Sequence, residues 1–410
     1  LDEEARLAAL AGAAGGEAKA KRLGDYIEGR KRFLLLPGER EPRLGPGAPA
    51  GLPELAAELG LPAFDAGLDA GYAAYRGALK AAGALDFDDL VAGAARLLAA
   101  RPEALAAYRG RFRAVFVDEY QDLNFAQYAL MRLLAPAELF VIGDPNQAIY
   151  GFRGSDRRFV GRFLEDYPGA AVYRLTRSFR CAPAIVGAAA RLAGADLGGT
   201  GAAVALHRAE YPTDKSEAEG IARQIDRLVG GTRFFALDSG TAGEGTPVLR
   251  SLGECAILVR AAALAPPIEK ALHDHGIPCR LVSDPGQEGY EFRTERVWIL
   301  TVHAAKGLEF DHVFVAGLED GILPFTLFEG RGGDADEGRL AERVEEERRI
   351  LYVAMTRARI GLYLSWAKER SFRGRQLALP PSRFLAELED LVPLVEREPR
   401  KPRDPQLGLF

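Results

Sequence analysis

The segment over residues 115–122 restricts the fold of this chain more than any other. It reads Val-Phe-Val-Asp-Glu-Tyr-Gln-Asp, an apolar run typical of a β-strand that ends in two adjacent carboxylates, Asp118 and Glu119. In open α/β sheets, ligands bind just beyond the carboxyl ends of the strands. One carboxylate there can hold Mg²⁺, while the other orients and deprotonates an attacking water. A buried strand followed by a charged turn is the structural alternative, and the whole string over residues 118–122 favours the functional interpretation.

Strand and helix signals alternate along most of the chain. We predict strands over residues 114–117, 139–142, 255–259, 297–302, 312–316 and 362–366. We predict helices over residues 125–134, 159–166, 184–193, 267–275 and 340–357. Residues 1–84, rich in Ala, Leu and charged side chains, are expected to be helical, as are residues 85–108. This alternation is typical of parallel sheets with crossover helices, so the predicted fold class is α/β.

The composition limits the architecture and the partners of the chain. At 410 residues, 48% of them hydrophobic, it is long enough for two or three domains with cores of their own. A net charge of −5 argues against a broadly basic protein that coats nucleic acid, but it allows a local groove for a strand. The cysteines lack metal-site spacing and indicate a reducing cytoplasm. No apolar run has the length of a membrane span, so we expect no membrane partner.

A second polar cluster, residues 143–154, follows the strand predicted at 139–142. Parallel strands would place Asp144 at the same sheet edge as Asp118. The amide of Gln147 can both donate and accept a hydrogen bond, which suits sensing a terminal phosphate or a water. Three further side chains form an aromatic and cationic set suited to stacking on bases and contacting a phosphate: Tyr150, Phe152 and Arg153. The alternative is a hairpin-like turn with core aromatics.

Two more clusters carry side chains that suit a phosphate or a nucleotide. Arg180 and Arg357 are permanently charged and can clamp a transferring phosphoryl group, although isolated arginines are more often surface ion-pair partners. Residues 301–310 follow a predicted strand and contain small residues that permit close backbone approach to a ligand. His303 could contact a nucleic-acid backbone there, and Glu309 could accept a hydrogen bond from a ribose. A satisfied structural histidine is the alternative for His303.

Taken together and in this order, the clusters resemble the motifs of the UvrD/Rep/PcrA group of superfamily-one DNA helicases. Residues 118–122 resemble the Walker B motif, and residues 143–154 resemble the motif that couples ATP to DNA. Residues 178–181 read Ser-Phe-Arg-Cys where the family usually reads Asn-Tyr-Arg-Ser. Two further stretches, residues 301–310 and 346–358, are similar to the last motifs of the family.

The resemblance implies two RecA-like, P-loop NTPase-type lobes with parallel sheets and a helical insertion in the first lobe. We expect the helical insertion at residues 1–84, the C-terminal part of the first lobe at 85–170, the second lobe at 171–395, and a disordered tail at 396–410. The second-lobe insertion that the family usually carries is reduced here to about residues 283–294.

The resemblance also implies a function: an ATP-dependent DNA helicase that moves 3′ to 5′ on single-stranded DNA, acting in DNA repair or replication with ATP and Mg²⁺. Single-stranded and duplex DNA would be its partners. The implied catalytic residues are Glu119, Gln147, Arg180 and Arg357. Those implied in cofactor binding are Asp118, which holds the metal, together with Asp144, Phe179 and Glu309. Those implied along the DNA path are Tyr150, Phe152, Arg153 and His303.

One departure from the family puts the activity of this chain in doubt. The sequence contains no Gly-Lys dipeptide, so it lacks the loop whose backbone and Lys hold the phosphates in this class. The first residue is Leu1, and truncation upstream is the simplest explanation. The alternative is a natural loss that leaves an ATPase-dead, DNA-binding module. In either case we expect the chain alone to be inactive.

The C-terminal pentapeptide resembles the peptide by which bacterial proteins dock on the replicative sliding clamp. It consists of Gln406, Leu407, Gly408, Leu409 and Phe410 after a basic, Pro-rich linker. Leu409 and Phe410 would be apolar anchors, and Gln406 would add an orienting hydrogen bond. The alternative is an apolar end that folds back on the second lobe.

Overall fold

The structure consists of two compact units, Leu1–Ala171 and Val172–Phe410, which are described separately. The computed structural model describes residues 2–135, 138–151, 154–201, 205–229, 249, 251–283, 295–327 and 337–395. Both units contain parallel strands joined by helices, so the predicted α/β class is confirmed. None of the helices in these ranges is long and apolar enough to cross a membrane.

Unit 1 is mainly helical. Its helices are α1 (Glu3–Ala14), α2 (Glu17–Arg32), α3 (Leu52–Leu59), α4 (Ala66–Ala81), α5 (Phe87–Ala100), α6 (Pro102–Arg109), α7 (Phe125–Leu134) and α8 (Arg158–Asp166). Side-chain caps start several of them; Asp86, for example, accepts the Asp89 N–H at the start of α5. The helical stretch predicted over residues 85–108 is divided into α5 and α6, because Pro102 cannot continue α5 and instead begins α6.

A buried ion-pair network joins three of these helices. The Lys31 ammonium on α2 lies 2.6 Å from Asp86 and 2.8 Å from Asp89, at the start of α5. The Tyr75 hydroxyl on α4 also donates to Asp86, at 2.8 Å. Burial opposes ionisation of Asp86, but Lys31 outweighs it and lowers the pKa of this carboxyl. Because Lys31 and Asp86 are both almost fully buried, the network fixes how α2, α4 and α5 pack.

The sheet of unit 1 has two parallel strands in the described residues, β1 (Ala114–Val117) and β2 (Glu138–Val141). The sequence predicted β1 correctly and placed β2 one residue too late. Successive side chains alternate between the faces of a sheet. Val117 and Leu139 pack against the core of unit 1. Phe116 and Phe140 lie on the exposed face, with their ring centroids 5.8 Å apart.

Unit 2 is built on a seven-stranded sheet with the strand order β3-β8-β7-β4-β6-β5, and β9 pairs antiparallel with β8. The strands are β3 (Ala205–Thr213), β4 (Cys255–Val259), β5 (Cys279–Val282), β6 (Val297–Thr301), β7 (Phe310–Ala316), β8 (Ala358–Phe372) and β9 (Arg375–Ala378). The helices are α9 (Pro183–Ala193), α10 (Asp214–Leu228), α12 (Ala265–Asp274), α13 (Glu337–Met355) and α14 (Arg383–Ala386). All strands except β9 run parallel.

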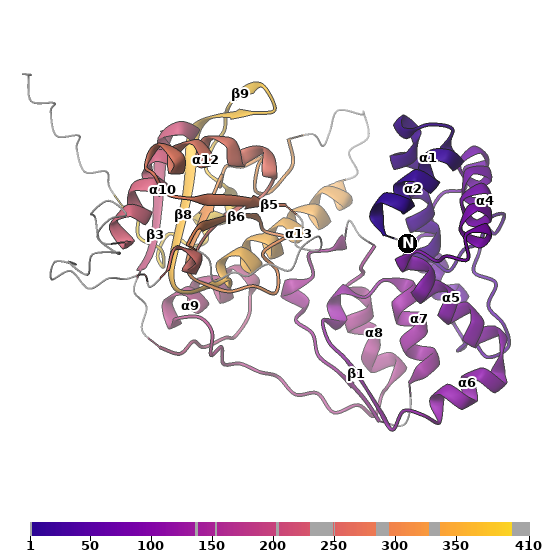
Figure 1. Cartoon of the computed structure of the whole chain (residues 1–410). Helices are drawn as coiled ribbons and strands as arrows, with labels where there is room; N and C mark the ends of the chain where they lie inside the picture. The colour runs from indigo at the N-terminus through magenta and orange to yellow at the C-terminus, as the bar shows by residue number, and fades with distance from the viewer. Residues whose placement is uncertain are drawn as a thin grey trace, which may run out of the picture. The chain divides into compact units, whose positions relative to one another are not determined.

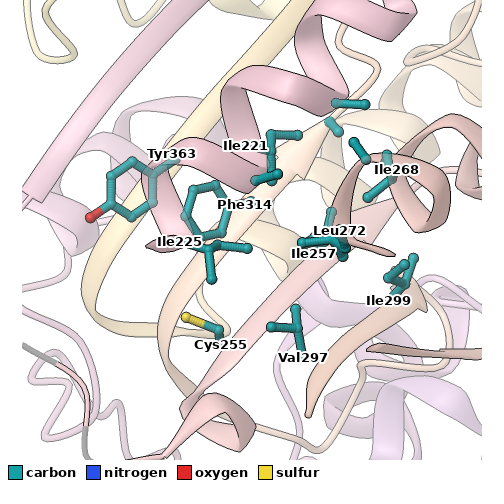
Figure 2. Close-up of a cluster of buried hydrophobic side chains, with 14 of the residues drawn as sticks. Ile221, Ile225, Cys255, Ile257, Ile268, Leu272, Val297, Ile299, Phe314 and Tyr363 are labelled. Atoms are coloured by element: carbon teal, nitrogen blue, oxygen red, sulfur yellow. The ribbon is translucent and has the colours of Figure 1, made fainter. Parts of the chain in front are cut away.

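The core of unit 2 lies between the sheet and helices α10 and α12, which pack side by side (Figure 1). Ile221 and Ile225 of α10 lie over Phe314 and Tyr363 of the sheet (Figure 2). Every residue of β4 is buried, which explains its continuous apolar sequence. Each buried aliphatic side chain of this kind stabilises the fold by about 1.5–3 kcal/mol.

The centre of the sheet leaves no room beside Gly361. Gly361 on β8 pairs with His312 on β7, and a methyl group at Gly361 would lie 2.2 Å from His312 Nδ1. The imidazole is fully buried, and burial lowers its pKa to about 4, so the ring is neutral in the folded protein at neutral pH. Glycine is therefore required at this position for packing rather than for backbone freedom.

Replacing Gly361 with Ala is expected to destabilise the protein by about 1–3 kcal/mol, because the added methyl group would overlap the fully buried ring of His312. Urea unfolding followed by circular dichroism measures the change. Gly187→Ala is the matched control, since Gly187 lies inside α9 with no atom within 4 Å of the added methyl group. Ala at that helical position should stabilise by about 0.5–1 kcal/mol. Equal stability of the two variants would contradict the packing described.

Candidate functional site

The parallel pairing of β1 and β2 brings two polar loops together in unit 1. Val117 pairs with Val141, and the Ile142 N–H donates to the Val117 carbonyl at 2.8 Å. Beyond the strand ends, the Tyr120 N–H donates to the Ile142 carbonyl at 2.9 Å. The carboxylates that follow β1 therefore share a sheet edge with the Gly-Asp turn that follows β2.

The two carboxylates after β1 are exposed and sit in a tight turn. Glu119 has φ 49° and ψ 42°, a left-handed conformation that is uncommon for residues other than Gly, and it precedes a 3₁₀ turn, η1 (Tyr120–Asp122). Asp118 Oδ1 accepts the Glu119 N–H at 2.9 Å. Such backbone strain occurs preferentially at functional sites and persists only where surrounding contacts hold it.

Asp118 fits a magnesium ion that takes most of its ligands from elsewhere. No group of three or more His, Cys, Asp or Glu side chains that could hold a metal occurs in the parts of the chain that the structure describes. Mg²⁺ commonly uses only one or two carboxylates and completes its shell with phosphate oxygens and water. The exposed carboxylate of Asp118 suits that mode of binding and does not suit an all-protein metal cage.

The loop after β2 is held together by Asp144. Its Oδ1 accepts the Asn146 N–H and its Oδ2 accepts from the Gln147 side-chain amide, both at 2.9 Å, around the 3₁₀ turn η2 (Pro145–Gln147). Asp144 thus orients Gln147 directly. Further along, Tyr150 is half-buried, while Phe152 and Arg153 lie outside the described residues.

Unit 2 brings together the segments of Arg180, Glu309 and Arg357, three residues that the sequence predicts to contact the nucleotide. Arg180 Nε donates to Glu309 Oε2 at 2.6 Å. The Phe310 N–H donates to the Arg357 carbonyl at 2.9 Å, which ties the loop of Glu309 to the end of α13. The Cys181 thiol donates to the Thr356 carbonyl at 3.4 Å, and burial raises its pKa, so it remains a neutral donor.

Arg357 is placed differently from Arg180. It is only 1% exposed, and its guanidinium donates to the carbonyls of Val353 at 3.1 Å and Leu308 at 3.2 Å. In this conformation Arg357 holds α13 against the loop that precedes β7. The sequence motif predicted a phosphate-facing arginine and gave no sign of these main-chain acceptors.

Phe179 and His303 lie in exposed or partly exposed segments of unit 2. The Phe179 ring is 81% exposed, and the Arg177 guanidinium lies 5.5 Å from its centroid. The sequence analysis did not single out Arg177. Side chains two residues apart in an extended segment lie on the same side, so the position of Arg177 before Phe179 was a signal that the two would lie together. His303 is half-buried in the turn after β6, where Thr301 Oγ1 accepts the Ala304 N–H at 3.2 Å. The C-terminal residues Gln406, Leu407, Leu409 and Phe410 lie outside the described residues.

A second arginine, Arg260, was also missed. It follows the apolar strand β4 directly and donates to both carboxylate oxygens of Glu347 on α13, at 2.8 and 2.7 Å. Glu347 is fully buried, so this pair helps to hold α13 against the end of β4. An arginine at the carboxyl end of a fully apolar strand was the available signal.

Comparisons with known proteins find domains of one helicase family in both halves of the chain. The UvrD/REP helicase N-terminal domain matches residues 64–168, and the UvrD-like helicase C-terminal domain matches residues 284–369. The chain belongs to the UvrD/Rep-like superfamily-one helicase family.

Individual relatives of this UvrD-like chain are longer than the chain itself. The ATP-dependent DNA helicase UvrD2 of Mycobacterium tuberculosis is 30% identical to this chain in an alignment 413 positions long. The alignment covers 75% of this chain and 55% of the relative. The DNA helicase II of Escherichia coli is 26% identical in an alignment 476 positions long, which covers 78% of this chain and 65% of the relative. The solved C-terminal domain of a possible DNA helicase from Lactobacillus plantarum aligns with 53% of this chain at 20% identity and a TM-score of 0.32.

The two arginine–glutamate pairs of unit 2 should respond differently to mutation. The Arg180–Glu309 pair is exposed by 34% and 46%, so Arg180→Met is expected to change the free energy of unfolding by less than about 1 kcal/mol. Arg260→Met would remove the bidentate partner of the buried Glu347, whose other arginine, Arg343, lies 3.9 Å away, and should destabilise by up to about 3–5 kcal/mol. Urea unfolding of both variants tests this. A loss of several kcal/mol in Arg180→Met would show that its pair is structural and not available to a ligand.

Proposed function

We propose that this chain is the motor part of an ATP-dependent DNA helicase that moves 3′ to 5′ along single-stranded DNA, in DNA repair or replication. The observation that carries the proposal is the pair of adjacent loops after β1 and β2, where an exposed carboxylate pair lies beside an amide oriented by Asp144. The names of the relatives support it. Unit 1 would contain the helical insertion and the C-terminal part of the first RecA-like lobe, and unit 2 would be the second lobe.

In unit 1, each polar side chain of the two loops has a distinct task in this proposal. Asp118 would hold Mg²⁺, which would neutralise charge on the phosphates when bound. Glu119 would orient the attacking water and accept its proton. The amide of Gln147 would contact the terminal phosphate, and Asp144, although we expected it in cofactor binding, would act by orienting that amide. These tasks need phosphates delivered to the carboxyl end of the sheet.

In unit 2, the proposed nucleotide contacts require existing bonds to exchange. If Arg180 turns from Glu309 toward a phosphate oxygen, Glu309 is released to accept from the ribose hydroxyl. Such an exchange is inexpensive, because exposed ion pairs contribute only about 0–1 kcal/mol. Arg357 would have to turn its guanidinium away from the Leu308 carbonyl. Phe179 would stack on the adenine through its exposed ring.

The proposed single-strand path combines aromatic and cationic side chains. Tyr150, Phe152 and Arg153 follow the loop of Gln147 directly in sequence, so a change in that loop on ATP hydrolysis would reach them first. His303, which belongs to unit 2, would contact the single-stranded DNA. Stacking of bases on aromatic rings stabilises binding by about 1–3 kcal/mol per base without sequence preference, which suits a translocase.

Glu119→Gln tests the proposed water-activating role in the complete gene product that contains these 410 residues. The substitution should lower the DNA-stimulated kcat for ATP by about 10²- to 10⁴-fold, the usual contribution of a general base. Glu165→Gln is the control, since Glu165 is an exposed carboxylate on α8 of the same unit. Equal rates in the two variants would remove Glu119 from the mechanism.

The 410-residue polypeptide by itself is expected to hydrolyse ATP poorly, because its sequence has no Gly-Lys phosphate loop. Phosphate release measured with and without single-stranded DNA tests this, and robust DNA-stimulated hydrolysis would contradict it. The alternative is an ATPase-dead, DNA-binding module tethered to the sliding clamp. A Gly-Lys-Ser/Thr loop encoded upstream in the same gene decides for the enzyme.

The C-terminal peptide is proposed to dock on the sliding clamp. Deleting residues 406–410 should abolish pull-down by the bacterial clamp, because Leu409 and Phe410 supply the apolar anchors. Replacing Gly408 with Ala in the full chain is the control and should leave binding largely intact. Clamp binding that survives the deletion would reject the assignment.

A further inference from the structure

Gln121 connects the two loops of unit 1. It lies in η1, two residues after Glu119, and its side chain is fully buried. Its Oε1 accepts the Asp144 N–H at 3.0 Å, at the end of β2. Its Nε2 donates to Oε2 of Glu119. One buried amide therefore bonds to the carboxylate after β1 and to the main chain after β2.

The direction of this amide follows from its partners. A main-chain N–H can only donate, so the Gln121 atom that faces Asp144 must be the oxygen. The NH₂ group then faces the Glu119 carboxylate, which can only accept while it is ionised. Gly143 makes the approach possible, because a methyl group there would lie 2.6 Å from Gln121 Oε1.

The hydrogen bonds continue to the far end of the second loop. Asp144 donates its N–H to Gln121 and accepts from Gln147 through its carboxylate. A continuous series thus runs from Glu119 through Gln121 and Asp144 to Gln147. Glu119 needs such support, because its left-handed backbone would not persist without contacts that hold it.

We propose that Gln121 is a positioning residue that fixes the Glu119 carboxylate and couples its orientation to the loop of Gln147. This inference rests on the proposed ATPase function and names a residue that acts through Glu119. An amide suits the task because it has one accepting and one donating end. Glutamate would keep the acceptor for Asp144 but would place a second negative charge against Glu119, and leucine would remove both bonds.

The first test measures the coupling itself in the 410-residue chain. Amide hydrogen exchange over residues 143–147 should become faster in Gln121→Leu, because the Asp144 N–H loses its acceptor. Gln127→Leu is the matched control, a glutamine of the same unit whose side chain bonds only within the α7 capping box. Unchanged exchange over residues 143–147 in Gln121→Leu would overturn the inference.

The second test measures catalysis in the complete gene product. Gln121→Leu should lower kcat by about 10- to 100-fold with little change in the KM for ATP, as expected for a misplaced catalytic group. In a Glu119→Gln background the same substitution should cause no further loss, because its effect passes through Glu119. Gln121→Glu should also lower kcat, because it keeps the acceptor for Asp144 but places a second negative charge against the Glu119 carboxylate and displaces it.

The outcomes separate this inference from the function on which it rests. Full activity of Gln121→Leu, or a loss of equal size with and without Glu119, overturns the positioning role and leaves the ATPase proposal standing. A merely structural role would lower stability and activity together and would change the KM for ATP as well as kcat. Absence of ATPase activity in the unsubstituted gene product rejects the proposed function, and the positioning role with it.

Discussion

The parallel pairing of β1 with β2 is the constraint on which the candidate site of unit 1 depends. Parallel strands end at the same edge, so two segments more than twenty positions apart in sequence deliver their polar loops to one place. The register Val117↔Val141 then decides which residues meet: one carboxylate pair, one glycine and one aspartate. A shift of the register by one residue would turn these side chains to the other face.

Buried and exposed ion pairs have separate places in this protein. Lys31 with Asp86 in unit 1 is almost fully buried, and so is the network in unit 2 in which Arg370 donates to Glu319 at 2.8 Å and also to Glu217. Breaking pairs of this kind leaves an uncompensated charge, so they keep the elements in one arrangement. The Arg180–Glu309 pair is exposed and can exchange partners. The buried pairs thus hold helices and strands in place, whereas the exposed pair lies in loops and can be replaced by contacts to a ligand.

The sequence predicted the apolar elements well and the amphipathic edge of the sheet poorly. Strand β4 and helix α7 were placed without error, because their apolar runs and flanking caps are local signals. Strand β3 was missed because its His, Arg and Glu residues interrupt the apolar pattern and because it contains a Pro, which an edge strand tolerates. Strand β5 and helix α10 were missed with it, since β5 is the other edge and α10 directly follows β3.

The polar details of the site could not be predicted for a different reason. A motif gives the residue types at a site, but not the atoms to which each side chain is bonded. Arg357 and Gln121 both lie within recognised motifs, yet one donates to main-chain carbonyls and the other joins two loops. Both arrangements depend on contacts between segments far apart in the sequence, which no local pattern encodes.

The small sheet of unit 1 has a practical consequence for anyone who handles this polypeptide. Phe116, Phe140 and Ile142 are 75%, 48% and 51% exposed, and no third strand pairs with β1 or β2 among the described residues. An uncovered apolar face with open strand edges is a template on which another polypeptide can add a strand. The solution behaviour of the 410-residue chain should therefore depend on protein concentration, with β1 and β2 as the place where molecules first adhere.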